Sequence, residues 1–138
     1  MNISIMLALV SLFCFGFVTF FNQVAGANQV YSPSYMIVAS TFVVLFAIVM
    51  HFLQKHPFEL STKMASMASL GGILGGIGVF AMLLAFKFGG QGSVIFPISG
   101  LCVIMSAMLS MIFYHEPVTA TKVLGLGLGI SSILMLTR

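Results

Sequence analysis

The side chains that could perform acid–base or ligand chemistry are few and widely separated in this sequence. Charged residues make up 5% of the 138 residues, five of them basic and two acidic, and there are three histidines and two cysteines. His115 directly precedes Glu116, so the two could form a proton-sensitive pair, but a carboxylate at this place also stabilises the start of the next helix through its dipole. We favour the second role and predict Glu116 to be a loop acid. His51 and His56 flank a polar segment, where solvated histidines are usual.

No residue pattern indicates an enzyme, a cofactor site or a metal site. The sequence has no nucleophile–base pairing, no metal-ligand spacing among its histidines and no phosphate-binding loop. The Gly-x-Gly-x-Gly run at 125–129 does not fit a nucleotide-binding turn, because no strand is expected before it and no acidic residue follows it. Cys14 and Cys102 fall in apolar stretches, where a small packing role is favoured over a disulfide or a metal pair. The basic residues are spread along the chain, which argues against a nucleic-acid partner.

Polar and aromatic residues within the apolar stretches are better suited to binding a solute. A cavity lined by aromatic and weakly polar residues favours a neutral or amphiphilic solute, or a charged solute that finds an opposite charge near the mouth of the cavity. Serines in these stretches either line such a cavity or hydrogen-bond to their own helix, and both interpretations remain open. Pro97 should kink or loosen its helix, and Lys87 reaches either the lipid headgroups or an anionic group. The predicted substrate cavity consists of Phe15, Asn22, Gln23, Lys87, Ser93, Phe96, Pro97 and Ser99.

Five long apolar runs must position these side chains. They cover approximately residues 3–25, 35–54, 66–88, 93–114 and 118–136, and short connections separate them, the first containing Gly26 and Pro33. A spanning helix needs about 20 mostly apolar residues. A soluble domain carries roughly a quarter charged residues, so a chain that is 60% hydrophobic and 5% charged is neither a soluble enzyme nor a disordered tail. We predict an all-α polytopic membrane protein in which residues 1–138 form a single domain of five transmembrane helices.

Glycines at a spacing of four residues mark helix faces that another helix can approach closely. Gly71 and Gly75 lie in the third run, and Gly125 and Gly129 lie in the fifth. We predict that these four glycines form helix-packing or dimer contacts.

Several residues of the C-terminal half occur in a recognisable order. Ala85 and Lys87 close the third run, Pro97 lies in the fourth, Glu116 follows the fourth, and Lys122 and Gly125 open the fifth. In these features the stretch resembles the EamA-type domain of the drug/metabolite transporter superfamily. The N-terminal half is similar to that domain in the number and spacing of its helices only.

The resemblance implies a helical transporter of ten spans built from two inverted five-helix halves, and this chain looks like one half. It implies a small organic solute as substrate, alternating access in a dimer, and a multi-pass location in a bacterial or archaeal cytoplasmic membrane. The chain is more distantly similar to the small multidrug resistance transporters, but its first run lacks an acidic residue, which puts their proton coupling in doubt. Two alternatives are a lipid-linked sugar flippase subunit and a non-transporting membrane assembly protein.

The distribution of basic residues bears on how two such halves are arranged. Five spans place the termini on opposite sides of the membrane. The side of the N-terminus then receives Lys55, Lys63 and Lys122, and the other side receives Lys87 and Arg138, which is a weak orientation bias. Two copies in opposite orientations would recreate an inverted repeat, so we expect an antiparallel homodimer. A parallel dimer with the N-terminus and the Lys55–Lys63 loop in the cytoplasm is the alternative.

Overall fold

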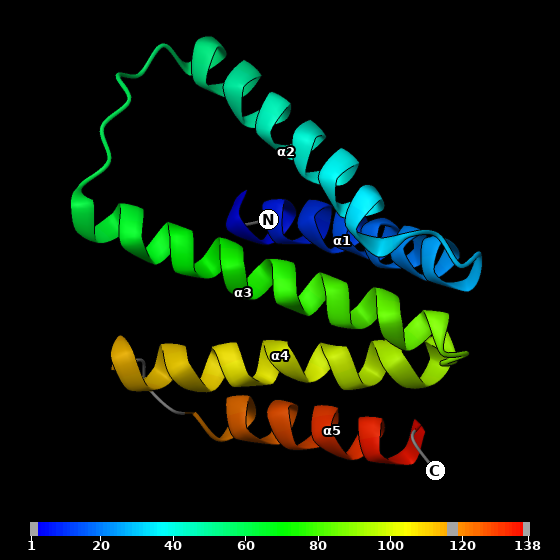
Figure 1. The fold of residues 1–138 in the computed structure, drawn as a ribbon. Helices are drawn as coiled ribbons and strands as arrows, with labels where there is room; N and C mark the ends of the chain where they lie inside the picture. Colours follow the sequence, from blue (N-terminus) through cyan, green and yellow to red (C-terminus); the bar gives the residue numbers. More distant parts are fainter. Residues whose placement is uncertain (1–2, 116–118, 137–138) are drawn as a thin grey trace. The chain divides into compact units, whose positions relative to one another are not determined.

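The regular structure of the described part of the chain is α-helical. The computed structural model describes residues 3–115 and 119–136, with the side chains of part of the last helix left out. Its helices are α1 (Ile3–Ala27), α2 (Ser32–Gln54), α3 (Thr62–Lys87), α4 (Gly92–Phe113) and α5 (Ala120–Leu136) (Figure 1). The first four are long and apolar enough to cross a membrane, and α5 is shorter, with 17 residues. The predicted all-α polytopic membrane fold is therefore confirmed.

Local capping explains why two helices begin earlier than the sequence runs suggested. Pro33 occupies the first turn of α2, where its missing N–H costs no hydrogen bond. The Ser61 hydroxyl oxygen accepts a hydrogen bond from the N–H of Met64 at 3.4 Å, which caps α3. The expected placement of Gly26 and Pro33 in a connection was wrong, because α1 extends to Ala27 and α2 begins at Ser32.

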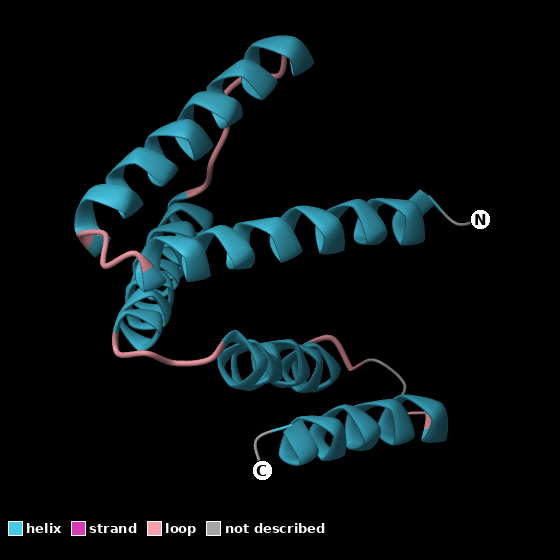
Figure 2. Cartoon of the chain, turned by 90° about the vertical axis from the view of Figure 1, so that its right-hand side faces the viewer, coloured by secondary structure: helices cyan, strands magenta, loops and turns pink. Residues whose placement is uncertain are grey.

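The helices group into two compact units, Met1–Gly89 and Gly90–Arg138. In the first unit α1 packs against α3, and α2 contacts both. Figures 1 and 2 show that α2 diverges from α1 and α3 along its length, with residues 55–61 connecting its far end to α3. In the second unit α4 and α5 pack against each other as an antiparallel pair (Figure 1).

Most large apolar side chains of α1, α2 and α3 lie on the surface of the chain. They include Phe13, Phe42 and Ile73, which are all more than half exposed. A water-soluble protein would bury such residues in a core, whereas a membrane protein presents them to lipid. This distribution agrees with helices surrounded by hydrocarbon.

Candidate substrate-binding site

The ends of α1 and α3 meet in a tightly packed contact. Ala25 and Gly26 of α1 and Leu83 and Phe86 of α3 are all buried. A Cβ atom added to Gly26 would lie 2.5 Å from the Cβ of Phe86 and 2.9 Å from the carbonyl oxygen of Leu83. Only glycine fits this approach without a shift of one helix, so Gly26 is a close-packing residue.

Asn22 lies one turn before Gly26 on α1 and is only 4% exposed. Its Nδ2 atom donates a long hydrogen bond to the Sδ atom of Met82, at 4.0 Å. A thioether is a weak acceptor, whereas an amide offers two N–H donors and a carbonyl oxygen. Burying an amide is costly unless it is hydrogen-bonded. Asn22 therefore holds hydrogen-bonding capacity that this one contact uses poorly.

A cavity of about 490 Å³ lies among α1, α2 and α3, and Asn22 lines it. On α3 the cavity is bounded by Gly72, Gly75 and Gly76, and a Cβ added at any of them would meet nothing within 4 Å. Tyr35 and Ser40 of α2 are the other polar lining residues, and the rest are apolar. The cavity is thus a mostly apolar space with the buried Asn22 among its lining residues.

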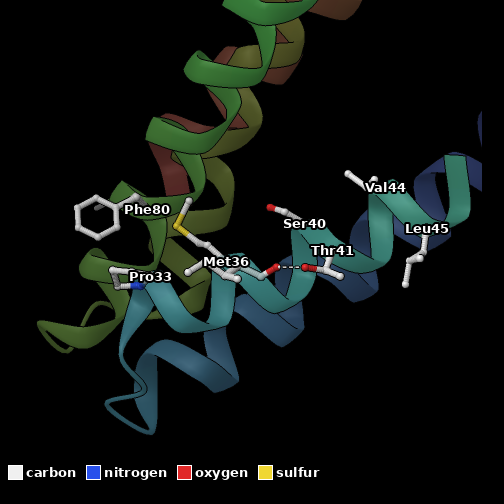
Figure 3. A pocket seen from close by; sticks show the side chains of 8 residues that line it. Pro33, Met36, Ser40, Thr41, Val44, Leu45 and Phe80 are labelled. Carbon is white, nitrogen blue, oxygen red and sulfur yellow. Dashed lines mark hydrogen bonds between the residues drawn. The ribbon is translucent and has the colours of Figure 1, made fainter. Parts of the chain in front are cut away.

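A wider groove of about 700 Å³ follows α2, with Phe80 of α3 at its edge (Figure 3). In the close-up, Met36 extends toward Phe80, and Val44 and Leu45 lie further along α2. The Thr41 hydroxyl donates to the carbonyl oxygen of Ile37 at 2.8 Å. Because this hydroxyl is used by its own helix, the groove offers mainly apolar surface. The cavity beside Asn22 is therefore the stronger candidate for a solute site.

The predicted cavity residues are divided between the two units. Within the first unit Asn22 is buried, Gln23 and Lys87 are half-buried, and Phe15 is exposed. The backbone carbonyl of Lys87 accepts a hydrogen bond from Nε2 of Gln29 at 2.9 Å, which ties the connection after α1 to the end of α3. Of the predicted residues in this unit, Asn22 alone lines the cavity among the three helices. The second unit holds the remaining predicted residues, which are Ser93, Phe96, Pro97 and Ser99.

Serine hydroxyls on α4 bond to the backbone of their own helix. Ser99 donates to the carbonyl oxygen of Ile95 at 2.8 Å, and Ser106 donates to that of Cys102 at 2.9 Å. These two contacts fit the own-helix interpretation of the serines. The helix continues through Pro97, whose missing N–H leaves one carbonyl of the preceding turn without its usual helical partner.

The glycines predicted to pack helices differ from one another. A Cβ added at Gly71, Gly75 or Gly125 would meet nothing within 4 Å, whereas one at Gly129 would lie 3.6 Å from Cδ1 of Ile104. Gly129 therefore borders the contact between α5 and α4, and the other three lie open in the described part of the chain.

Comparison with known protein families decides the class of the chain. The profile of the EamA-like transporter family matches residues 2–138. The chain belongs to the EamA-like transporter family. No curated protein and no solved structure was found to match it. The membrane-span-capable helices and the family together make it a multi-pass membrane protein of a transporter family.

Some residues assigned from the sequence of this EamA-like chain fall outside the described structure. Glu116 and Arg138 are not described, and neither is the side chain of Lys122. Within residues 3–115 and 119–136, no three His, Cys, Asp or Glu side chains come close enough to hold a metal ion.

Sequence reasoning missed the contribution of α2 to the cavity of the EamA-like chain. It placed the cavity on the first, third and fourth helices, yet Tyr35, Met36 and Ser40 of α2 line it beside Gly72 and Gly76 of α3. A hydroxyl in the middle of an apolar run, as at Ser40, was the available signal.

Proposed function

We propose that the chain moves a small organic solute across the membrane by alternating access, as a dimer of two five-helix halves. Membership of the EamA-like transporter family is the observation that carries this proposal. The cavity beside Asn22 supports it, because a space of about 490 Å³ lies in the usual range for small-molecule sites.

The solute path in this proposal begins at the contact between α1 and α3. Asn22 supplies a buried amide there, and the half-buried Gln23 and Lys87 lie near the same helix ends. Phe15 of α1 is the further candidate in the first unit, and the sequence-based candidates on α4 are Ser93, Phe96, Pro97 and Ser99. Mostly weakly polar and aromatic walls favour a neutral or amphiphilic solute.

The second half of the transporter is proposed to be another copy of the chain in the opposite orientation. The near balance of Lys and Arg between the two sides supports insertion in both directions. Opposite copies would form the inverted repeat on which alternating access depends. The open glycines Gly71 and Gly125, which do not line the cavity beside Asn22, leave room for a helix of the second copy.

Two assays test the proposal. In the first, proteoliposomes containing the purified chain are offered a mixture of cell metabolites, and the solutes that enter are measured by mass spectrometry against empty liposomes and the Asn22→Ala variant. We expect at least one solute to enter with the wild-type chain only. Movement of a fluorescent sugar-linked lipid alone would instead support a flippase subunit, and movement of neither would support an assembly protein.

The second assay concerns orientation. Reporters active only in the cytoplasm or only outside it are fused to the C-terminus. We expect signal from both reporters, and signal from one alone would contradict the antiparallel dimer.

A further inference from the structure

The cavity among α1, α2 and α3 combines a buried amide on one wall with a glycine surface on another. We propose that it binds a neutral, mostly apolar molecule that offers one hydrogen-bonding group, such as a hydroxyl, to the Asn22 amide. The inference rests on the proposed transport function for its biological meaning, but the binding site is complete within one copy of the chain.

The hydrogen-bonding requirement follows from the surroundings of Asn22. The side chain is 4% exposed, and its amide makes one long contact, to the sulfur of Met82 at 4.0 Å. A hydroxyl or carbonyl oxygen is a far better partner for an amide N–H than a thioether. A ligand with such a group therefore improves the hydrogen bonding of a side chain that is already buried.

The neutral charge of the ligand follows from the composition of the cavity wall. None of its lining residues is Lys, Arg, His, Asp or Glu, and Tyr35 and Ser40 are its polar members besides Asn22. Lys87 is half-buried at the end of α3 but does not line this cavity. An unpaired charge placed among apolar side chains carries a large desolvation cost. The wall thus disfavours both cations and anions.

The apolar body of the ligand has a defined place on α3. Gly72, Gly75 and Gly76 lie within about one turn of each other and present backbone without side chains to the cavity. A Cβ there would meet no other atom within 4 Å, so this surface is not filled by packing within the described chain. We expect a flat apolar group, such as an aromatic ring, to lie on this surface with its polar group directed toward Asn22.

Photolabelling of the purified full chain in lipid nanodiscs tests the assignment. The probe is hydroxymethyl-benzophenone, which is neutral and carries one hydroxyl group. Aminomethyl-benzophenone and benzoylbenzoate serve as its cationic and anionic counterparts. Labelled peptides are mapped by mass spectrometry, and excess diphenylmethanol, which is not photoreactive, separates specific from lipid-phase labelling. We expect competed labelling in residues 35–44 and 72–79, about tenfold stronger for the neutral probe.

Two variants, each with a matched control, locate the site. Asn22→Leu removes the amide at similar size, and Asn28→Leu changes an exposed asparagine that does not line the cavity. Gly76→Val fills the glycine surface, and Gly78→Val adds the same group at an open glycine outside the cavity. We expect about tenfold less competed labelling for the first member of each pair and no change for its control.

Each outcome decides for or against the site. Labelling that is spread along the helices without competition, that survives Asn22→Leu or Gly76→Val, or that is stronger for a charged probe would overturn the assignment. Labelling reports binding without movement, so the proposed function is judged separately. A labelled cavity in a chain that moves no solute would refute transport and leave the site intact, whereas transport without competed labelling would refute the site alone.

Discussion

Replacing Gly26 by alanine adds one methyl group where α1 and α3 approach closely. The new Cβ would lie 2.5 Å from the Cβ of Phe86 and 2.9 Å from the carbonyl oxygen of Leu83. Carbon atoms pack best at about 3.5–4.0 Å, so the two helices must separate by about 1 Å at this end. Neither contacted atom can move away by a change of side-chain rotamer, because one is a Cβ and the other belongs to the backbone.

The expected cost combines two opposing effects. Overpacking a closely fitted contact costs about 1–3 kcal/mol, while alanine is favoured over glycine within a helix by about 0.5–1 kcal/mol. We expect Gly26→Ala to lower the free energy of unfolding by about 1 kcal/mol. Gly16→Ala is the matched control, because Gly16 lies on the same helix and a Cβ there meets nothing within 4 Å. It should leave stability unchanged or slightly raised.

Reversible unfolding of the purified chain in mixed micelles, driven by sodium dodecyl sulfate and followed by circular dichroism, measures both variants against the wild type. The Gln29 contact to the carbonyl of Lys87 at the same helix ends should weaken in Gly26→Ala as the helices separate. Equal stability of the two variants would refute the close packing of α1 on α3.

Three further predictions concern other parts of the fold. Ser61→Ala removes the cap of α3 and should lower the free energy of unfolding by about 0.5–1 kcal/mol, and an unchanged value in the same assay would show that the cap is not formed. Gly129→Leu should weaken the contact between α4 and α5, because the new side chain meets Ile104, whereas Gly127→Leu should leave it unchanged. Limited proteolysis compares how well the two variants protect this helix pair, and equal resistance would count against the contact. Thr41→Val should change the uptake of a transported solute less than twofold, because this hydroxyl bonds to its own helix; a large loss would place it on the solute path.

Features that depend on local composition could be predicted from the sequence. The helices follow from apolar runs long enough to cross a bilayer, because no other backbone arrangement of such runs pairs its polar groups there. Asn22 was expected to be a polar cavity residue of the first run, and the structure places it, 4% exposed, among the lining residues of a cavity; that this cavity binds a substrate stays a prediction.

Features that depend on contacts between distant residues could not be predicted. Gly26 stands in a Gly-Ala-Asn sequence that is equally typical of a connection, and its close packing depends on Leu83 and Phe86, which lie far along the chain. Tyr35 and Ser40 line the cavity because of the rotation of α2 relative to α3. The Ser40 hydroxyl marks one polar position in an apolar run, but it does not set that rotation.

The mass of the assembly formed by the purified chain in a bilayer tests the proposed half-transporter most directly. The chain is reconstituted alone in lipid nanodiscs, crosslinked through its lysines at several protein-to-lipid ratios and measured by native mass spectrometry. A dimer with twice the 14.8 kDa mass of one chain is the expected result. A single-chain mass under every condition would contradict the account.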